Sequence, residues 1–165
     1  ALTVTGHLGY GLARCTHGLA AGCWYYEVTV DHGEHEGNCR IGWVQSKRDV
    51  QLQAYPGFDE WGYGYRDKEG TYFHEARACG SGEPYGKGDV IGCLIWVPPE
   101  FLASTKAELL MKGGLKEEYD ACESRFLAEG RETQCDVMDL HTTVAGSQLV
   151  FYKNGHTCGT AFWNL

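Results

Sequence analysis

The chain has 165 residues and carries 14 Lys and Arg against 22 Asp and Glu, which gives a formal net charge of −8. This acidic balance argues against a general surface for nucleic acid or anionic membranes, and no apolar run is long enough to cross a membrane. The 23 glycines and the 13% of aromatic residues fall on short runs, which favours an all-β sandwich over a helical bundle. We expect one domain, 1–165, with a core of its own.

Several stretches alternate apolar and polar residues in the way that is typical of half-buried antiparallel strands. The clearest is Trp-Tyr-Tyr-Glu-Val-Thr-Val at 24–30, whose even-numbered residues form one apolar face. Residues 39–44 predict a further strand with Arg40 at its head, and weaker patterns predict short strands at 2–4 and 9–14.

Two hairpins are predicted from turn residues that stand between apolar runs. Residues 63–66 and 71–74 flank a four-residue turn that ends in glycine. The second hairpin, 148–162, contains Asn154-Gly155, and this pair suits a type I′ turn because it tolerates two positive φ angles.

The apolar run 89–97 is predicted to be a strand buried on both faces, because it is almost unbroken and too short for a good helix. Gly92 in its interior indicates the close approach of a neighbouring backbone or side chain. The small residues at 76–88 are interpreted as a loop leading into this strand. The predicted core consists of Trp24, Tyr26, Trp43, Val90, Ile91, Leu94 and Ile95.

Eight cysteines occur without a Cys-x-x-Cys pair or zinc-finger spacing, which favours reduced structural thiols over disulfides or a metal site. Such thiols are typical of a reducing, intracellular setting. His32 and His35 share one acidic loop, but a zinc site needs further ligands, and we predict neither a metal nor a cofactor.

Residues 53–66, Gln-Ala-Tyr-Pro-Gly-Phe-Asp-Glu-Trp-Gly-Tyr-Gly-Tyr-Arg, are unusually rich in aromatic residues and glycine. Such a stretch either packs over one end of the core or forms a recognition surface, and the pattern leaves both open. The composition then changes at 100–146, which we interpret as one insertion with helical spacing at 115–126.

Four segments together resemble the SPRY domain: 22–28 (Gly-Cys-Trp-Tyr-Tyr-Glu-Val), 40–43 (Arg-Ile-Gly-Trp), 88–93 (Gly-Asp-Val-Ile-Gly-Cys) and 151–155 (Phe-Tyr-Lys-Asn-Gly). The resemblance implies an all-β, bent antiparallel β-sandwich of the SPRY/B30.2, concanavalin-like type, which binds peptides through its loops. The insertion at 100–146 would precede the last hairpin.

A narrower resemblance rests on Gly9-Tyr10, Arg14 and Thr16-His17-Gly18, on 53–66 and on Gly70-Thr71-x-Phe73-His74. These residues are similar to the SPRY domain of the Ash-two/Bre-two subunit of COMPASS and mixed-lineage-leukaemia type histone H3 lysine-four methyltransferases. That family continues past the position of Leu165, so the resemblance predicts that its last strands are missing from this chain.

The resemblance implies a nuclear, non-catalytic module that docks an acidic, phosphorylatable segment of a retinoblastoma-binding-protein-five or Swd-one type subunit. Through that segment it would stimulate the SET-domain subunit, with contact to the nucleosome left open and with no small-molecule substrate or membrane. The partner-binding residues implied are Tyr10, Arg40, Tyr55, Pro56, Phe58 and Arg66. Phe58 replaces a Tyr of the family, and Tyr55 occupies the position of the family's loop Pro, one residue before Pro56.

Structural alternatives stay open for individual residues. Arg40 could form an internal salt bridge, Arg66 could be a solvated side chain beside Asp67, and Tyr10 could be an ordinary sheet aromatic. Arg14 fits either the same surface or an internal ion pair. Arginine is nevertheless the residue type that a carboxylate- or phosphate-rich peptide requires, because its planar fork offers two parallel donors.

Two other functions were considered. A SPRY substrate-recognition module of a ubiquitin ligase is the alternative, and the long insertion weighs against it. A hydrolase or lectin is disfavoured because a glycosidase needs two carboxylates facing one cleft, whereas the adjacent Asp59 and Glu60 would point apart on an extended chain.

Overall fold

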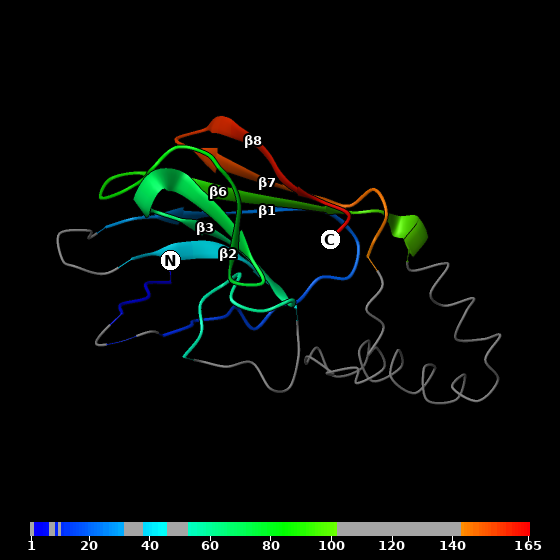
Figure 1. Ribbon diagram of the computed structural model, residues 1–165, viewed down its shortest axis with the longest axis horizontal. Coiled ribbons are helices and arrows are strands. Elements are labelled where there is room, and N and C mark those ends of the chain that lie inside the picture. Colours follow the sequence, from blue (N-terminus) through cyan, green and yellow to red (C-terminus); the bar gives the residue numbers. More distant parts are fainter. Residues whose placement is uncertain (1, 7–8, 10, 32–37, 46–52, 102–142) are drawn as a thin grey trace.

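The computed structural model of the chain describes residues 2–6, 9, 11–31, 38–45, 53–101 and 143–165. Two antiparallel sheets of four strands each make up the fold (Figure 1). Sheet A has the order β1-β6-β7-β8 and contains β1 (Gly22–Thr29), β6 (Val90–Val97), β7 (Gln148–Lys153) and β8 (His156–Trp163). Sheet B has the order β2-β3-β4-β5 and contains β2 (Arg40–Val44), β3 (Gly62–Arg66), β4 (Thr71–His74) and β5 (Arg77–Ser81).

This architecture confirms the predicted all-β sandwich. A short 3-10 helix, η1 (Lys68–Gly70), lies between β3 and β4, and residues 99–101 are helical. Residues 102–142 of the predicted insertion, which include the helical spacing at 115–126, lie outside the described residues. No helix in the described ranges is long and apolar enough to cross a bilayer.

The core lies between the two sheets and is dominated by aromatic rings. Alternate residues of each strand point inward, so both sheets contribute one face. Phenol hydroxyls also join the sheets: Tyr26 donates to the Gly42 carbonyl oxygen at 2.6 Å, and Tyr72 donates to the Cys158 carbonyl oxygen at 3.2 Å. Burial raises the pKa of Tyr72 to about 12 and keeps its hydroxyl a donor. The buried cluster consists of Ile41, Tyr65, Tyr72, Tyr85, Ile91, Cys93, Leu149, Phe151 and Phe162.

The predicted core is correct for most of its residues but wrong for Trp24. Ile91 and Ile95 are buried, and Tyr26 and Trp43 pack against the cluster. Trp24 is 52% exposed, and its indole N–H donates to the Ala21 carbonyl oxygen at 2.7 Å. This local hydrogen bond holds the ring against the turn that precedes β1.

Strand β6 lies inside sheet A, between β1 and β7, but it is not buried on both faces as predicted. Ile91 and Cys93 face the core, whereas Val90 and Leu94 are only half-buried. The close approach predicted at Gly92 is confirmed, because a Cβ atom there would overlap the Tyr25 hydroxyl.

The expected strands at 2–4 and 9–14 are not found in the described parts of those ranges, and Leu2 is 97% exposed. The expected loop at 76–88 instead begins with β5. The turn that joins β4 to β5 has Glu75 and Ala76 at φ angles of 51° and 57°, a left-handed conformation that neither residue type favours. Sequence composition could not indicate such a turn.

The six described cysteines form no disulfide among themselves. Cys93 is buried as a structural thiol would be, whereas Cys15, Cys23, Cys39 and Cys79 are exposed. Within the described ranges no cluster of three or more His, Cys, Asp and Glu residues could hold a metal ion, and the loop with His32 and His35 lies outside those ranges.

The Asn154-Gly155 hairpin is confirmed and is tied to the start of β6. Asn154 and Gly155 have φ angles of 52° and 80°. The Asn154 side chain accepts from the Val90 N–H at 2.8 Å and donates to Asp89 at 2.8 Å. Asp89 also accepts from the Gly86 N–H at 2.9 Å. These hydrogen bonds, that of Asn154 first, lower the pKa of Asp89 below its ordinary value of 3.8.

Replacing Asp89 by Asn should therefore destabilise the protein in a pH-dependent way. A carboxyl group with a lowered pKa contributes stability above its unfolded value, and that contribution is lost as the pH falls through the lower folded pKa. We expect Asp89→Asn to cost about 1 kcal/mol near neutral pH and to cost much less below about pH 3. Urea unfolding of both proteins across this range measures the difference, and a difference that does not change with pH would contradict the assignment.

Candidate functional site

The stretch 53–58 forms a platform on the outer face of sheet B. The Pro56 carbonyl oxygen lies so close to Gly64 that a Cβ atom there would overlap it, and a Cβ atom at Gly57 would overlap the Phe73 carbonyl oxygen. The Ala76 N–H donates to the Gly57 carbonyl oxygen at 2.9 Å, which ties the platform to the β4–β5 turn. Glycines are required here because two backbones pass within van der Waals contact.

Arg40 lies at the start of β2 and points to this same outer face, because its neighbour Ile41 faces the core. Its guanidinium carbon lies 3.3 Å from the centroid of the Tyr55 ring and 4.4 Å from that of the Phe73 ring. Both distances are typical of cation–π contacts, which are strongest where water is excluded. The platform thus holds the charge of Arg40 between two aromatic rings.

Two nitrogen atoms of the Arg40 guanidinium lack hydrogen-bond partners among the described residues. Its Nε and Nη1 atoms are buried, and neither has an acceptor in the described structure. A buried donor without an acceptor is costly, typically by about 1–3 kcal/mol, so such groups are rare in folded proteins. The predicted alternative of an internal salt bridge for Arg40 has no support among the described residues, where the ion pairs found at Lys153 do not involve Arg40.

Arg66 is the direct cross-strand partner of Arg40 in the β2–β3 register. Its Nε and Nη2 atoms donate to Asn38 Oδ1 at 3.2 Å and 2.8 Å. The neighbouring Asp67 is engaged elsewhere: it accepts from the Cys39 N–H at 2.9 Å and from the Lys68 N–H at 2.7 Å. Two like charges therefore face each other on one sheet face, and no described carboxylate pairs with either of them. Such an arrangement is destabilising in isolation.

Phe58 and Pro56 complete the described part of the site. Phe58 is 43% exposed, and its ring meets the Tyr55 ring edge-on with the centroids 5.4 Å apart. The Phe58 N–H donates to the Tyr55 carbonyl oxygen at 3.0 Å, which closes a tight turn around Pro56. Pro56 itself is half-buried and shapes the platform.

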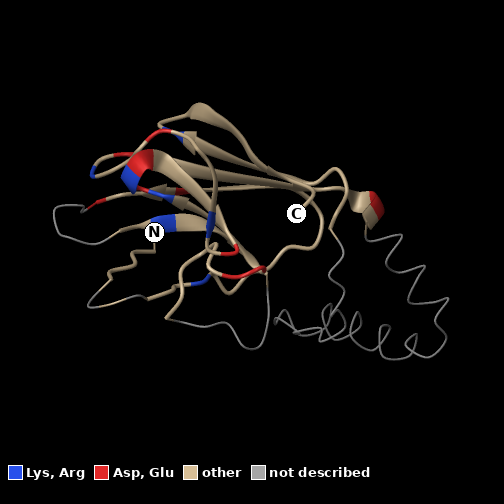
Figure 2. Ribbon diagram, in the orientation of Figure 1, with Lys and Arg blue, Asp and Glu red and all other residues tan. Residues whose placement is uncertain are grey.

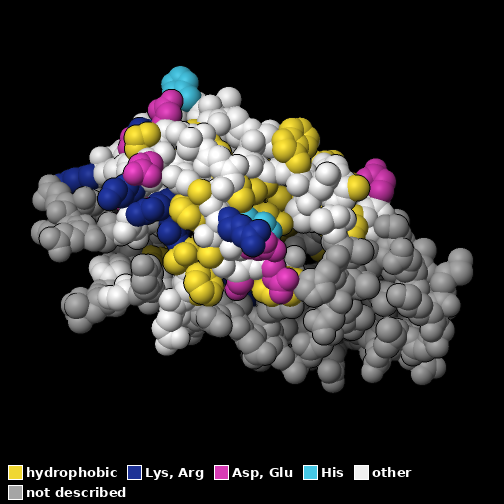
Figure 3. Space-filling view, viewed as in Figure 1, with side chains coloured by type: hydrophobic (Ala, Val, Ile, Leu, Met, Phe, Trp, Pro, Cys, Tyr) yellow, Lys and Arg dark blue, Asp and Glu magenta, His cyan; other side chains and the backbone are white. Residues whose placement is uncertain are grey.

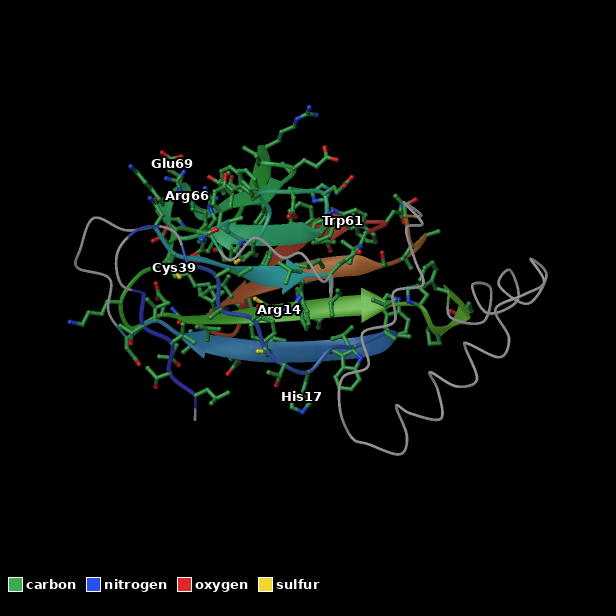
Figure 4. All side chains as sticks on the ribbon, turned by 90° about the horizontal axis from the view of Figure 1, so that it is seen from below. Arg14, His17, Cys39, Trp61, Arg66 and Glu69 are labelled. Carbon is green, nitrogen blue, oxygen red and sulfur yellow. The ribbon has the colours of Figure 1, made fainter. Side chains whose placement is uncertain are left out.

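The structure thus brings together Arg40, Arg66 and the 55–58 turn. Tyr10 lies outside the described residues. Arg14 is exposed and lies well away from Arg66, on the N-terminal segment (Figure 4). Phe73 and Asn38 were missed by sequence reasoning, because only the strand register and the folded platform place them against the arginines.

Charge is unevenly distributed over this acidic protein. Lys and Arg residues mark the adjoining ends of β2 and β3 (Figure 2). In the space-filling view, basic side chains gather at this end of the molecule beside hydrophobic ones (Figure 3). The site therefore offers a cationic and aromatic surface, which suits an anionic peptide better than a neutral one.

Comparison with known proteins identifies the family that part of this chain matches. The sequence pattern of the SPRY domain matches residues 23–99. Residues 23–99 belong to the SPRY domain family. They include both arginines and the 53–58 platform.

The similarity extends beyond that pattern to the whole chain. The chain is 34% identical to the Set1/Ash2 histone methyltransferase complex subunit ash-2 of Caenorhabditis elegans, over 99% of this chain and 29% of that protein. It is 33% identical to the subunit ASH2 of the Drosophila melanogaster complex, over 99% of this chain and 28% of that protein. It is 31% identical to the Set1 complex component ash2 of Schizosaccharomyces pombe, over 100% of this chain and 27% of that protein. The SPRY chain thus spans less than a third of each relative.

The platform of the SPRY domain should fail if Gly64 gains a side chain. A Cβ atom there must displace the Pro56 backbone, so we expect Gly64→Ala to lower the free energy of unfolding by about 1–3 kcal/mol. Gly86→Ala is the matched control, because nothing lies within 4 Å of its Cβ position. Urea unfolding compares the two variants. Equal urea concentrations at the unfolding midpoint would show that the platform is not in close contact with β3 at Gly64.

Proposed function

We propose that this chain is the protein-interaction module of an Ash2-like subunit in a nuclear histone H3 lysine-four methyltransferase complex. In this proposal the SPRY domain does no chemistry. It docks an acidic, phosphorylatable segment of a retinoblastoma-binding-protein-five or Swd-one like subunit and so stimulates the SET-domain subunit. The whole-chain similarity to Set1/Ash2 complex subunits supports the setting.

One observation carries the docking site: Arg40 and Arg66 lie side by side without a carboxylate partner among the described residues, and two buried nitrogens of Arg40 have no acceptor there. A chain that aligns two cations in this way leaves their compensation to a partner. An anionic side chain that binds here would relieve the repulsion between the arginines and form charge-assisted hydrogen bonds. The rings of Tyr55 and Phe58 would shield those bonds from water.

The ubiquitin-ligase alternative finds no comparable support, because the three relatives matched over the whole chain are named as subunits of Set1 or Set1/Ash2 complexes. The proposal also includes a single domain over 1–165. It further includes Tyr10 as a contact of the bound segment, and it leaves room for a contact with the nucleosome.

Binding of an acidic peptide should depend on both arginines. We expect Arg40→Ala to weaken binding by about 2 kcal/mol or more, because its charge is largely desolvated, and Arg66→Ala to weaken it less, because that side chain is more open to water. Titration calorimetry with a synthetic Asp- and Glu-rich peptide, with serine or phosphoserine at its centre, measures both changes. Arg77→Ala is the control, since Arg77 is exposed on β5, the strand of sheet B farthest from β2. Unchanged binding in both site variants would refute the docking site.

The same substitutions should reduce methylation when the full-length subunit is used. In a reconstituted complex with the SET-domain subunit and a histone H3 peptide, Arg40→Ala combined with Arg66→Ala should lower the rate toward that of the complex without this subunit. Arg77→Ala should leave the rate unchanged. If the double variant loses peptide binding but stimulates fully, docking occurs at this site but does not transmit the stimulation.

A further inference from the structure

We infer that Asn38 is a positioning residue for Arg66, a neutral acceptor that aims the guanidinium and leaves its whole positive charge for the anionic partner. This inference rests on the proposed function, and it assigns a specificity-determining role to a residue that contacts no ligand itself. It follows from the geometry of the Arg66 fork, from the chemistry of the residue at 38 and from the way in which that residue is held.

The fork geometry decides which donors of Arg66 remain. A guanidinium has five N–H donors. One oxygen, Asn38 Oδ1, accepts from Nε and from one N–H of Nη2, so it occupies the side edge of the group. The second N–H of Nη2 and both N–H groups of Nη1 have no partner in the described part of the chain. One N–H of Nη1 and that second N–H of Nη2 form the end edge, which can bind a carboxylate or phosphate through two parallel hydrogen bonds.

The residue type at 38 decides how much charge remains. An aspartate in the same place would accept the same two hydrogen bonds and would also form an ion pair, which would largely compensate Arg66 before any partner arrived. An asparagine supplies the same oxygen without the charge. The nearest carboxylate along the chain, Asp67, is likewise kept from this role because its two oxygens accept backbone N–H groups of Cys39 and Lys68.

The backbone next to Asn38 is held by several hydrogen bonds, which lets the Asn38 side chain orient the Arg66 guanidinium. It directly precedes Cys39, whose N–H donates to the Asp67 side chain and whose carbonyl oxygen accepts from the Asp67 N–H at 3.0 Å and from the Tyr85 hydroxyl at 3.2 Å. Tyr85 is buried in the core and donates also to the Tyr65 carbonyl oxygen at 2.8 Å. The backbone at 38 and 39 is thus fixed against β3, which fixes the direction of the Arg66 fork.

The decisive test replaces Asn38 by Asp, which is almost the same size and keeps the hydrogen bonds. We expect Asn38→Asp to weaken binding of the Asp- and Glu-rich peptide about tenfold and to flatten the dependence of affinity on salt, because one cation is compensated internally. Its melting temperature should be equal to or higher than that of the parent protein. A merely structural asparagine would leave both affinity and salt dependence unchanged in a variant that folds this well.

Asn38→Ala separates aiming from charge. It removes the acceptor but leaves Arg66 charged, so we expect a smaller loss of affinity, about threefold, with the salt dependence retained. The inference is overturned if Asn38→Asp binds as the parent protein does while Arg66→Ala binds more weakly, because charge compensation at Arg66 would then be irrelevant. If Arg66→Ala and Arg40→Ala also bind unchanged, the proposed docking site fails instead.

Discussion

The contact on which this SPRY domain's outer surface depends is the stacking of the Arg40 guanidinium between the rings of Tyr55 and Phe73. It can form only because the 53–58 stretch lies flat on sheet B, and this in turn requires that Gly57 and Gly64 have no side chains. The carbonyl oxygens of Gly57 in the platform and of Asp59 just after it accept the N–H groups of the β4–β5 turn, which has a left-handed conformation. A few missing Cβ atoms therefore determine where a cation, two rings and a turn are placed.

Much of the fold could be predicted from the sequence because its signals are local. Asn154-Gly155 specified a turn type, and alternation identified the strands around it. The prediction was wrong where tertiary contacts override local preference. Glu75 and Ala76 adopt positive φ because Asp59 and Gly57 accept their N–H groups, and no property of Glu or Ala indicates this. Trp24 alternates as a core residue should, yet it is held outside by the turn before its strand.

The candidate site was less predictable, for a different reason. From composition, the aromatic stretch 53–66 could have covered the core or formed a recognition surface. In the structure, the backbone of Pro56 and Gly57 covers the outer face of sheet B, while the ring of Phe58 remains exposed beside that of Tyr55. The two arginines were predicted as site residues from a family resemblance, because no sequence pattern of their own indicated them. Asn38 could not be found in this way, because its role exists only in the register that sets β2 against β3.

In the proposed function, a protein with an overall charge of −8 would bind an anionic segment, which is unexpected. The difficulty lessens when distance is considered. At physiological ionic strength the Debye length is about 8 Å, so carboxylates scattered over the rest of the surface are largely screened from a ligand at this end of the sandwich. Arg40 is not screened in the same way, because rings exclude water from its faces. In this proposal, selectivity for an anion would depend less on the total charge than on keeping these two guanidinium groups uncompensated, and the neutral side chain of Asn38 would serve that end.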